Sequence, residues 1–159
     1  MIYLLTHERE VLKRSNTGQI ATQIAPNDVK VILWARKEPH LELLNLIEQG
    51  KVALVYPAEE GEEDINAGDS KGFEHFIVLD ATWQEARKIF NKSPYLKALP
   101  RIHIKTDGPS RFTLRRNQVE GGLCTAEVVA HLLAQTGQTQ TSEAISEALG
   151  QFIDTYHHR

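Results

Sequence analysis

The hydrophobic pattern of the chain centres on residues 76–90. Residues 76–79 are four consecutive apolar residues, which predict a strand buried on both faces rather than the alternating pattern of a half-exposed strand. After this run the spacing becomes helical: Trp83, Ala86, Arg87 and Phe90 fall at i, i+3, i+4 and i+7, so the helix is expected to turn this side inward. This stretch therefore predicts a strand, a short turn and a helix.

The same two periodicities recur on both sides of this unit. Further strands are predicted at residues 2–5, 29–34, 51–56, 101–105 and 111–115, and helices at residues 8–14, 19–24, 40–49, 125–135 and from 141 onward. Strands that alternate with helices indicate an α/β fold, with a mostly parallel sheet covered by helices on both faces. No repeat or linker divides residues 1–159, so we expect one domain. We expect a mobile acidic surface loop at residues 58–72 and a frayed tail at residues 156–159.

Capping residues mark several helix ends. Thr82 and Glu85 have the spacing of a capping box at the start of the central helix. Thr17 is placed to cap the helix at 19–24, and Gly18 follows it at a turn where freedom in φ is expected. In the helix at 40–49, Leu41, Leu44 and Ile47 are expected to face inward, and Gly50 ends that helix.

Asp80 is the candidate functional residue of the central unit. It directly follows the buried strand, and open α/β sheets bind their ligands at the carboxyl ends of strands. Two roles are open to this carboxylate: capping the helix that follows, or binding and chemistry in a pocket.

Charge is distributed unevenly along the chain. The formal net charge is −3, but nine of the 18 Lys and Arg residues lie between residues 87 and 116 with a single acid. That segment therefore carries +8 and the rest of the chain −11. Such asymmetry favours a face that binds a polyanion, and the alternative is a solvated lysine-rich surface.

The cysteine count, the lengths of the apolar runs and the placement of histidines argue against several classes of protein. With one cysteine, Cys124, the chain has no internal disulfide and no cysteine-built zinc cluster. No apolar run approaches the roughly 20 residues of a membrane helix, and the first residues do not resemble a signal peptide, so we expect a cytoplasmic protein without a membrane partner. His7 and Glu10 have a spacing found in metal sites, but without a third candidate on the same element a solvent-facing or hydrogen-bonded pair is favoured.

Four short motifs together resemble the DTW-domain family. Asp80-Ala81-Thr82-Trp83 matches its D-x-T-W signature, and His7-x-x-Glu10 followed by Asn16-Thr17-Gly18 is similar to its H-x-x-E…N-T-G motif. Residues 112–115 (Phe-Thr-Leu-Arg) resemble its aromatic-x-aliphatic-Arg element, and residues 123–127 (Leu-Cys-Thr-Ala-Glu) resemble its L-S-T-x-E helix start. The motifs occur in the family's order between residues 4 and 131.

The resemblance implies a tRNA-uridine aminocarboxypropyltransferase with a SPOUT-like fold, knotted in its C-terminal half. Such enzymes transfer the 3-amino-3-carboxypropyl group of S-adenosyl-L-methionine to N3 of a uridine and release methylthioadenosine. The expected partner is tRNA or another structured RNA, and the oligomeric state is left open. Two departures from the family's pattern matter. Many members carry a cysteine cluster ahead of the first strand and this sequence begins after it, so no metal is expected; and Cys124 replaces the usual serine.

Roles follow for the residues that match the motifs. Asp80, with Thr82 and Trp83, is assigned to catalysis: the carboxylate would take the N3 proton, and Trp83 either stacks on the uracil or belongs to the core. Residues assigned to the donor are Gly121, Gly122, Leu123, Cys124, Thr125 and Glu127. Residues assigned to RNA are Arg87, Lys88, Arg111, Arg115 and Arg116; for Arg111, Arg115 and Arg116 the donor's carboxylate is the alternative ligand. Residues assigned to shaping the pocket are His7, Glu10, Asn16 and Thr17. Two other functions are weighed against this one: a SPOUT-like RNA methyltransferase and a non-catalytic RNA-binding protein.

Overall fold

The architecture is a parallel sheet between two layers of helices. The structure, a computed structural model, describes residues 1–11, 13, 16–56, 65–66, 72–104 and 124–157, without the side chains of residues 65, 66, 83, 156 and 157. Within these ranges the strands are β1 (Ile2–Thr6), β2 (Val29–Leu33), β3 (Val52–Val55), β4 (Ile65–Asn66), β5 (His75–Asp80) and β6 (Arg101–His103). They form one sheet in the order β2-β1-β5-β3-β6-β4, and every strand pair is parallel. The predicted α/β class and parallel sheet are confirmed.

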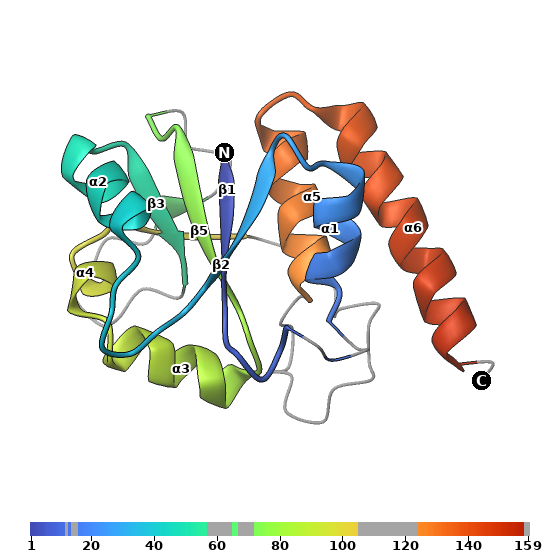
Figure 1. Ribbon diagram of the computed structural model, residues 1–159. Coiled ribbons are helices and arrows are strands. Elements are labelled where there is room, and N and C mark those ends of the chain that lie inside the picture. Colours follow the sequence, from blue (N-terminus) through green and yellow to red (C-terminus); the bar gives the residue numbers. More distant parts are fainter. Residues whose placement is uncertain (12, 14–15, 57–64, 67–71, 105–123, 158–159) are drawn as a thin grey trace.

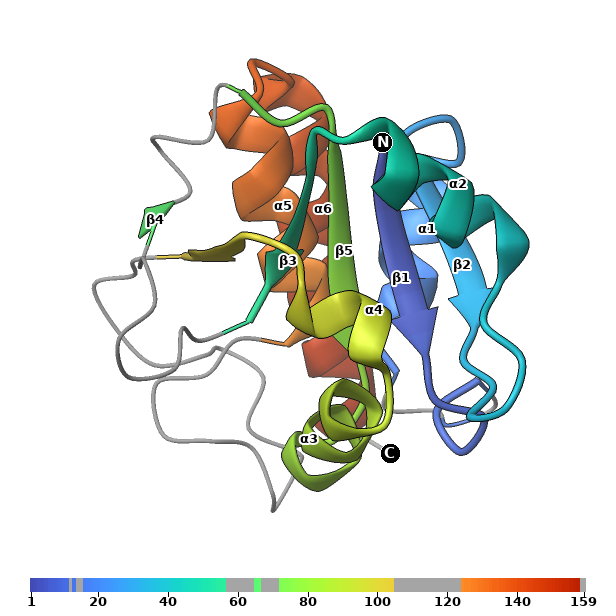
Figure 2. The same ribbon diagram turned by 90° about the vertical axis from the view of Figure 1, so that its left-hand side faces the viewer.

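The helices of the described part are α1 (Gly18–Ile24), α2 (Leu41–Gln49), α3 (Trp83–Asn91), α4 (Pro94–Lys97), α5 (Thr125–Gln135) and α6 (Thr139–His157). Helices α1, α5 and α6 cover one face of the sheet, and α2, α3 and α4 lie on the other (Figure 1). Figure 2 shows β2 and β4 at opposite edges of the sheet, with α3 below the carboxyl ends of the central strands.

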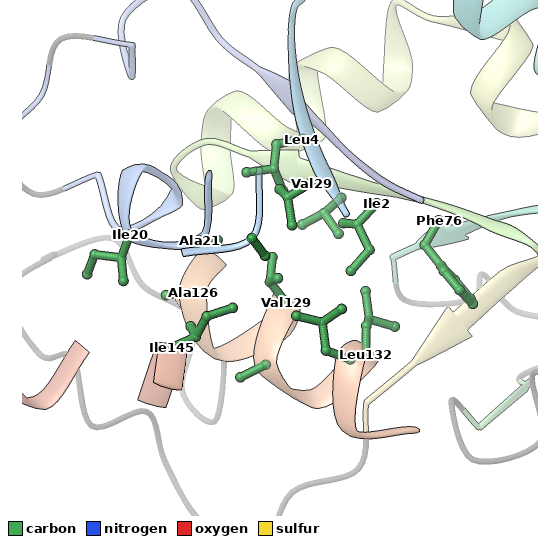
Figure 3. Close-up of a cluster of buried hydrophobic side chains, with 14 of the residues drawn as sticks. Ile2, Leu4, Ile20, Ala21, Val29, Phe76, Ala126, Val129, Leu132 and Ile145 are labelled. Carbon is green, nitrogen blue, oxygen red and sulfur yellow. The ribbon is translucent and has the colours of Figure 1, made fainter. Parts of the chain in front are cut away.

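Two hydrophobic cores fill the space between the layers. Phe76 and Val78 of β5 belong to the core under α1, α5 and α6, whereas Ile77 and the half-buried Leu79 belong to the core under α2, α3 and α4. Figure 3 shows part of the first core, where side chains of the sheet meet Val129 and other residues of α5. Because successive side chains of a strand point to opposite faces, a strand that lies inside two cores is apolar at every position. This burial explains the run at residues 76–79.

Several local predictions are wrong. Residues 8–11 form turns instead of a helix, with hydrogen bonds from Glu10 N to His7 O and from Lys13 N to Glu10 O. In α2 the buried residue is Leu43, whereas Leu41 is 75% exposed. Residues 65–66, expected in a loop, pair with β6, and the short α4 was not expected. Helix α6 continues to His157, so residues 156 and 157 are helical rather than part of a tail.

The SPOUT-like and knotted expectations stay predictions. They concern the C-terminal half of the chain, where residues 105–123 lie outside the described part, together with the predicted strand at 111–115 and the glycine turn before α5. The expected mobile loop at 58–72 also falls there, apart from β4 and Gly72.

The connections around β1 and β5 form the kind of strand arrangement at which open α/β sheets commonly bind ligands. These strands are neighbours, but α1 follows β1 on one face and α3 follows β5 on the other. Helices that leave neighbouring parallel strands toward opposite faces open a crevice at the carboxyl ends of those strands. Asp80 ends β5 and pairs with Thr6 at the end of β1, so both residues lie at this point.

Candidate functional site

The Asp80 carboxylate is the centre of a buried polar cluster. Asp80 is 2% exposed, and three side chains of the described part donate hydrogen bonds to it. Thr125 Oγ1 donates to Oδ1 at 2.7 Å and Asn16 Nδ2 donates to Oδ2 at 3.0 Å. Thr6 Oγ1 shares its one hydrogen between Oδ2 at 3.3 Å and Leu4 O at 3.1 Å. A buried carboxylate is costly unless hydrogen bonds replace its water, and these donors meet that need. The predicted site residue Asp80 therefore acts as the junction between β1, the segment before α1, and α5.

Gly18 allows the first turn of α1 to approach this carboxylate. A Cβ atom built on Gly18 would lie 2.8 Å from Asp80 Oδ2 and 2.9 Å from Asn16 Oδ1. The expectation that Gly18 supplies an unusual φ is wrong, because the positive φ angles among the described glycines belong to Gly50 and Gly137. The reason for glycine here is steric: no side chain fits between the helix and Asp80.

Asn16 and Thr17 connect segments that are distant in the sequence. Asn16 Nδ2 also donates to Glu10 O at 2.9 Å, and Asn16 Oδ1 accepts the Gly18 N–H at 2.7 Å. Thr17 makes no side-chain cap on α1, contrary to the prediction; its Oγ1 accepts the N–H of Ala126, in the first turn of α5, at 3.0 Å. The H-x-x-E…N-T-G motif is thus joined directly to the helix start at residue 125.

Cys124 and Glu127 organise the start of α5. Glu127 Oε1 accepts the Cys124 N–H at 3.2 Å, as in a capping box. Cys124 is 8% exposed, and burial raises the pKa of its thiol to about 12. A thiol with such a pKa is protonated at neutral pH and is a poor nucleophile. Cys124 therefore fits a structural role at this position.

A second polar group, formed by His7, Glu85 and Trp34, lies beside the first. The His7 ring stacks on Trp34, with centroids 5.9 Å apart, and its Nδ1 is 3.7 Å from Glu85 Oε2. Glu85 forms the predicted capping box with Thr82, which is confirmed. Burial raises the pKa of the Glu85 carboxyl, but the hydrogen bonds with Thr82 and the nearby His7 and Lys13 outweigh it, so this pKa lies below its ordinary value.

The structure brings some predicted site residues together and leaves others apart. Glu10 is fully buried and pairs with Lys13, with 3.2 Å between Oε1 and Nζ. Arg87 and Lys88 are exposed on α3, whereas Arg101, counted in the basic segment, is 4% exposed and lies over the Phe90 ring. Trp83 begins α3, but its side chain lies outside the described part, as do Gly121, Gly122, Leu123, Arg111, Arg115 and Arg116.

Sequence reasoning missed Thr6, Gly18 and Trp34 as parts of the site. Thr6 had a signal, since it is the polar residue that ends the apolar run of β1, as Asp80 does for β5. A cavity of about 280 Å³ between α5 and α6 was also unexpected; Glu127 lines it together with His131, Ser142 and Ser146.

Over the residues whose positions are described, no group of three or more His, Cys, Asp or Glu could hold a metal ion. No helix in the same ranges is long and apolar enough to cross a membrane.

The fold and the site define an α/β protein with a polar cluster at the carboxyl ends of two central parallel strands. A model of the DTW domain matches residues 1–157, so the chain belongs to the DTW-domain family, which confirms the resemblance carried by the four motifs. The chain is 27% identical to a tRNA-uridine aminocarboxypropyltransferase 2 of Drosophila melanogaster over 138 residues, covering 84% of this chain and 55% of the relative. It is 26% identical to proteins of the same name from Macaca fascicularis and Mus musculus over 140 residues, covering 84% of this chain and 46% of each relative.

The chain spans about half the length of these curated relatives. Comparison with solved structures gives no significant match.

Proposed function

We propose that this chain is a tRNA-uridine aminocarboxypropyltransferase, which transfers the 3-amino-3-carboxypropyl group of S-adenosyl-L-methionine to N3 of a uridine. The observation that carries the proposal is the Asp80 cluster. It joins three of the four family motifs at the crevice where α/β sheets bind ligands. The names of the relatives support the same activity and a tRNA substrate.

The reaction requires one bond to form and one to break. N3 of the uracil loses its proton and bonds to the γ-carbon of the donor, while the bond from that carbon to sulfur breaks. The sulfur keeps the electron pair and leaves as methylthioadenosine. Since a sulfonium is already a good leaving group, the protein must mainly align N3, carbon and sulfur and accept the proton.

Asp80 is the proposed final acceptor of the N3 proton, and Thr125 is the group through which the proton reaches it. With 2% exposure the carboxylate has little direct contact with a ligand, whereas Thr125 is half-buried. Thr125 Oγ1 already donates to Asp80 Oδ1 at 2.7 Å. The hydroxyl can take the proton from N3 as it passes its own proton to the carboxylate.

The remaining predicted residues have proposed roles around this pair. The adenosyl donor is placed along the start of α5, near Cys124, Thr125 and Glu127 and the preceding residues Gly121, Gly122 and Leu123. The exposed Arg87 and Lys88 would bind RNA phosphates, together with Arg111, Arg115 and Arg116. Glu10, Asn16 and Thr17 shape the pocket through the contacts described above, and Thr82 holds the first turn of α3, with Trp83 directly after it.

Mass spectrometry of the reaction products tests the proposal. The chain is incubated with tRNA and S-adenosyl-L-methionine, and the nucleosides and the spent donor are identified. Aminocarboxypropyl-uridine with methylthioadenosine is the expected result. S-adenosylhomocysteine with a methylated nucleoside would instead show a methyltransferase. Tight RNA binding with neither product would contradict enzymatic function.

A further inference from the structure

The imidazole of His7 is held rigidly beside the Asp80 cluster. Its backbone N–H donates to Asp80 O at 3.3 Å, which fixes the residue at the carboxyl end of β1. Its ring stacks on Trp34, whose Nε1 in turn donates to Ser93 Oγ at 2.9 Å. His7 is 5% exposed. The ring is thus positioned before any substrate arrives.

The contacts at Nδ1 determine where the ring carries its proton. The backbone N–H of Arg9 donates to His7 Nδ1 at 3.1 Å, so Nδ1 is an acceptor and the proton of the neutral ring is on Nε2. Nδ1 also faces Glu85 Oε2 at 3.7 Å, so both of its neighbours belong to the protein. Nε2 carries the hydrogen, so this atom is a donor and cannot be the base.

The Nε2 atom of His7 is available to donate a hydrogen bond to a ligand. Among the residues that the structure describes, no group forms a hydrogen bond with it. The side-chain atoms of these residues that are fully buried without a hydrogen bond, such as His75 Nδ1, do not include His7 Nε2. Since His7 Nε2 has no hydrogen bond within this part and is still not in that group, the atom reaches solvent although His7 as a whole is almost fully buried. A fixed donor with an open end, next to a buried carboxylate, is typical of a group that binds a developing negative charge.

We propose that His7 Nε2–H donates a hydrogen bond to a carbonyl oxygen of the target uracil; this inference rests on the proposed function. N3 lies between the C2 and C4 carbonyls, so loss of its proton spreads negative charge onto O2 and O4. A donor at one of these oxygens stabilises that charge while N3 bonds to the γ-carbon and sulfur leaves. The N3 proton goes to Asp80 through Thr125, and His7 transfers none.

Two substitutions at position 7 separate this role from a structural one. His7→Phe keeps an aromatic ring against Trp34 but removes the donor, and His7→Gln keeps a side-chain N–H near the position of Nε2. We expect His7→Phe to lower kcat about 100-fold with KM for tRNA changed less than about threefold, because oxyanion donors act mainly in the transition state. We expect His7→Gln to stay within about tenfold of the wild type, and both variants to melt near the wild-type temperature.

The substrate supplies a second readout, which also applies if His7→Phe does not fold. tRNAs that carry 2-thiouridine or 4-thiouridine at the target position replace one carbonyl oxygen by sulfur, a weak acceptor. We expect the difference between the wild type and the position-7 variants to shrink on one of the two thio-substrates. If His7→Phe does not fold, His7→Leu, which also lacks the donor, replaces it in the same comparison.

The outcomes distinguish this inference from the proposed function. If the wild type releases no methylthioadenosine, the proposed function fails. If the wild type is active and His7→Phe matches it, or if Phe and Gln reduce kcat equally, the donor role is overturned. A difference between wild type and variants that is the same on uridine and on both thio-substrates would also overturn it.

Discussion

Replacing Gly18 by alanine tests whether the Asp80 carboxylate is anchored as tightly as its contacts indicate. The new Cβ atom would lie 2.8 Å from Asp80 Oδ2 and 2.9 Å from Asn16 Oδ1, about 0.5 Å closer than ordinary van der Waals contact. Neither oxygen can move freely: Asp80 is held by Thr6, Asn16 and Thr125, and Asn16 is held at both ends of its amide. The substitution must therefore distort hydrogen bonds or shift α1.

The expected cost follows from these contacts. Overpacking typically costs ~1–3 kcal/mol, and a weakened hydrogen bond to a charged group ~1.5–3 kcal/mol. Alanine also lowers the conformational entropy of the unfolded chain, which stabilises the folded state by only ~0.4–1 kcal/mol. We expect a loss of about 2 kcal/mol in the free energy of unfolding, which for a chain of this length lowers the melting temperature by about 4–8 °C.

Thermal and urea unfolding of Gly18→Ala, with Gly72→Ala as the matched control, measures this loss. Gly72 has no atom within 4 Å of its built Cβ and no positive φ, so its variant should stay within ~0.5 kcal/mol of the wild type. Equal stability of the two variants would show that the Asp80 carboxylate can shift away from the new Cβ atom at little energetic cost, and so is not tightly anchored.

Three further predictions concern the cluster and the basic surface. Thr125→Val should lower transfer about 100-fold and Thr125→Ser much less, measured as methylthioadenosine release, because serine retains the hydroxyl that bonds Asp80; equal losses would exclude the relay. Burial raises the pKa of Cys124 from 9.0 to about 12, so the unfolded chain loses this proton first as pH rises, and the thiol's contribution to stability is full below pH 9 and is lost between pH 9 and 12. Urea unfolding should therefore show a steeper decline for the wild type than for Cys124→Ser across that window, and parallel curves would contradict the raised pKa. The double variant Arg87→Gln, Lys88→Gln should weaken tRNA binding and reduce the slope of log K against log salt concentration by up to about 0.9 per lost phosphate contact. The control Lys51→Gln, at the amino end of β3, should change neither the affinity nor the slope. An unchanged slope in the double variant would show that the RNA binds elsewhere.

Predictions from the sequence succeeded where local interactions decide the structure. The run at residues 76–79 predicted a strand buried on both faces, and β5 has this burial because its side chains alternate between two cores. The capping box of Thr82 and Glu85 is contained in four consecutive residues, so it could be predicted without the fold. The end of α2 at Gly50, where φ is 88°, is local in the same way.

Predictions failed where two local solutions were equally good or where the partner is distant. Helix α2 has apolar residues on two overlapping faces, and the core under α2 selects Leu43, Leu46 and Ile47 instead of the face that contains Leu41. Thr17 has the spacing of a cap for α1, but its partner is Ala126, 109 positions further along the chain. No property of residues 16–24 indicates that contact, because it exists only once α5 has packed against α1.

The Asp80 cluster links the stability of the fold to the proposed chemistry. A buried carboxylate without donors is strongly destabilising, so Asp80 is tolerated because Thr6, Asn16 and Thr125 come together from three separate segments. The same contacts place the Thr125 hydroxyl before any substrate binds, so folding itself pre-organises the proposed site. Substitution of Asp80 removes both the proposed proton acceptor and the centre of this network, and lost activity alone would not separate the two effects. Substitutions at Thr125 and His7 are more informative, because each removes one hydrogen-bonding group and leaves the buried carboxylate with other donors.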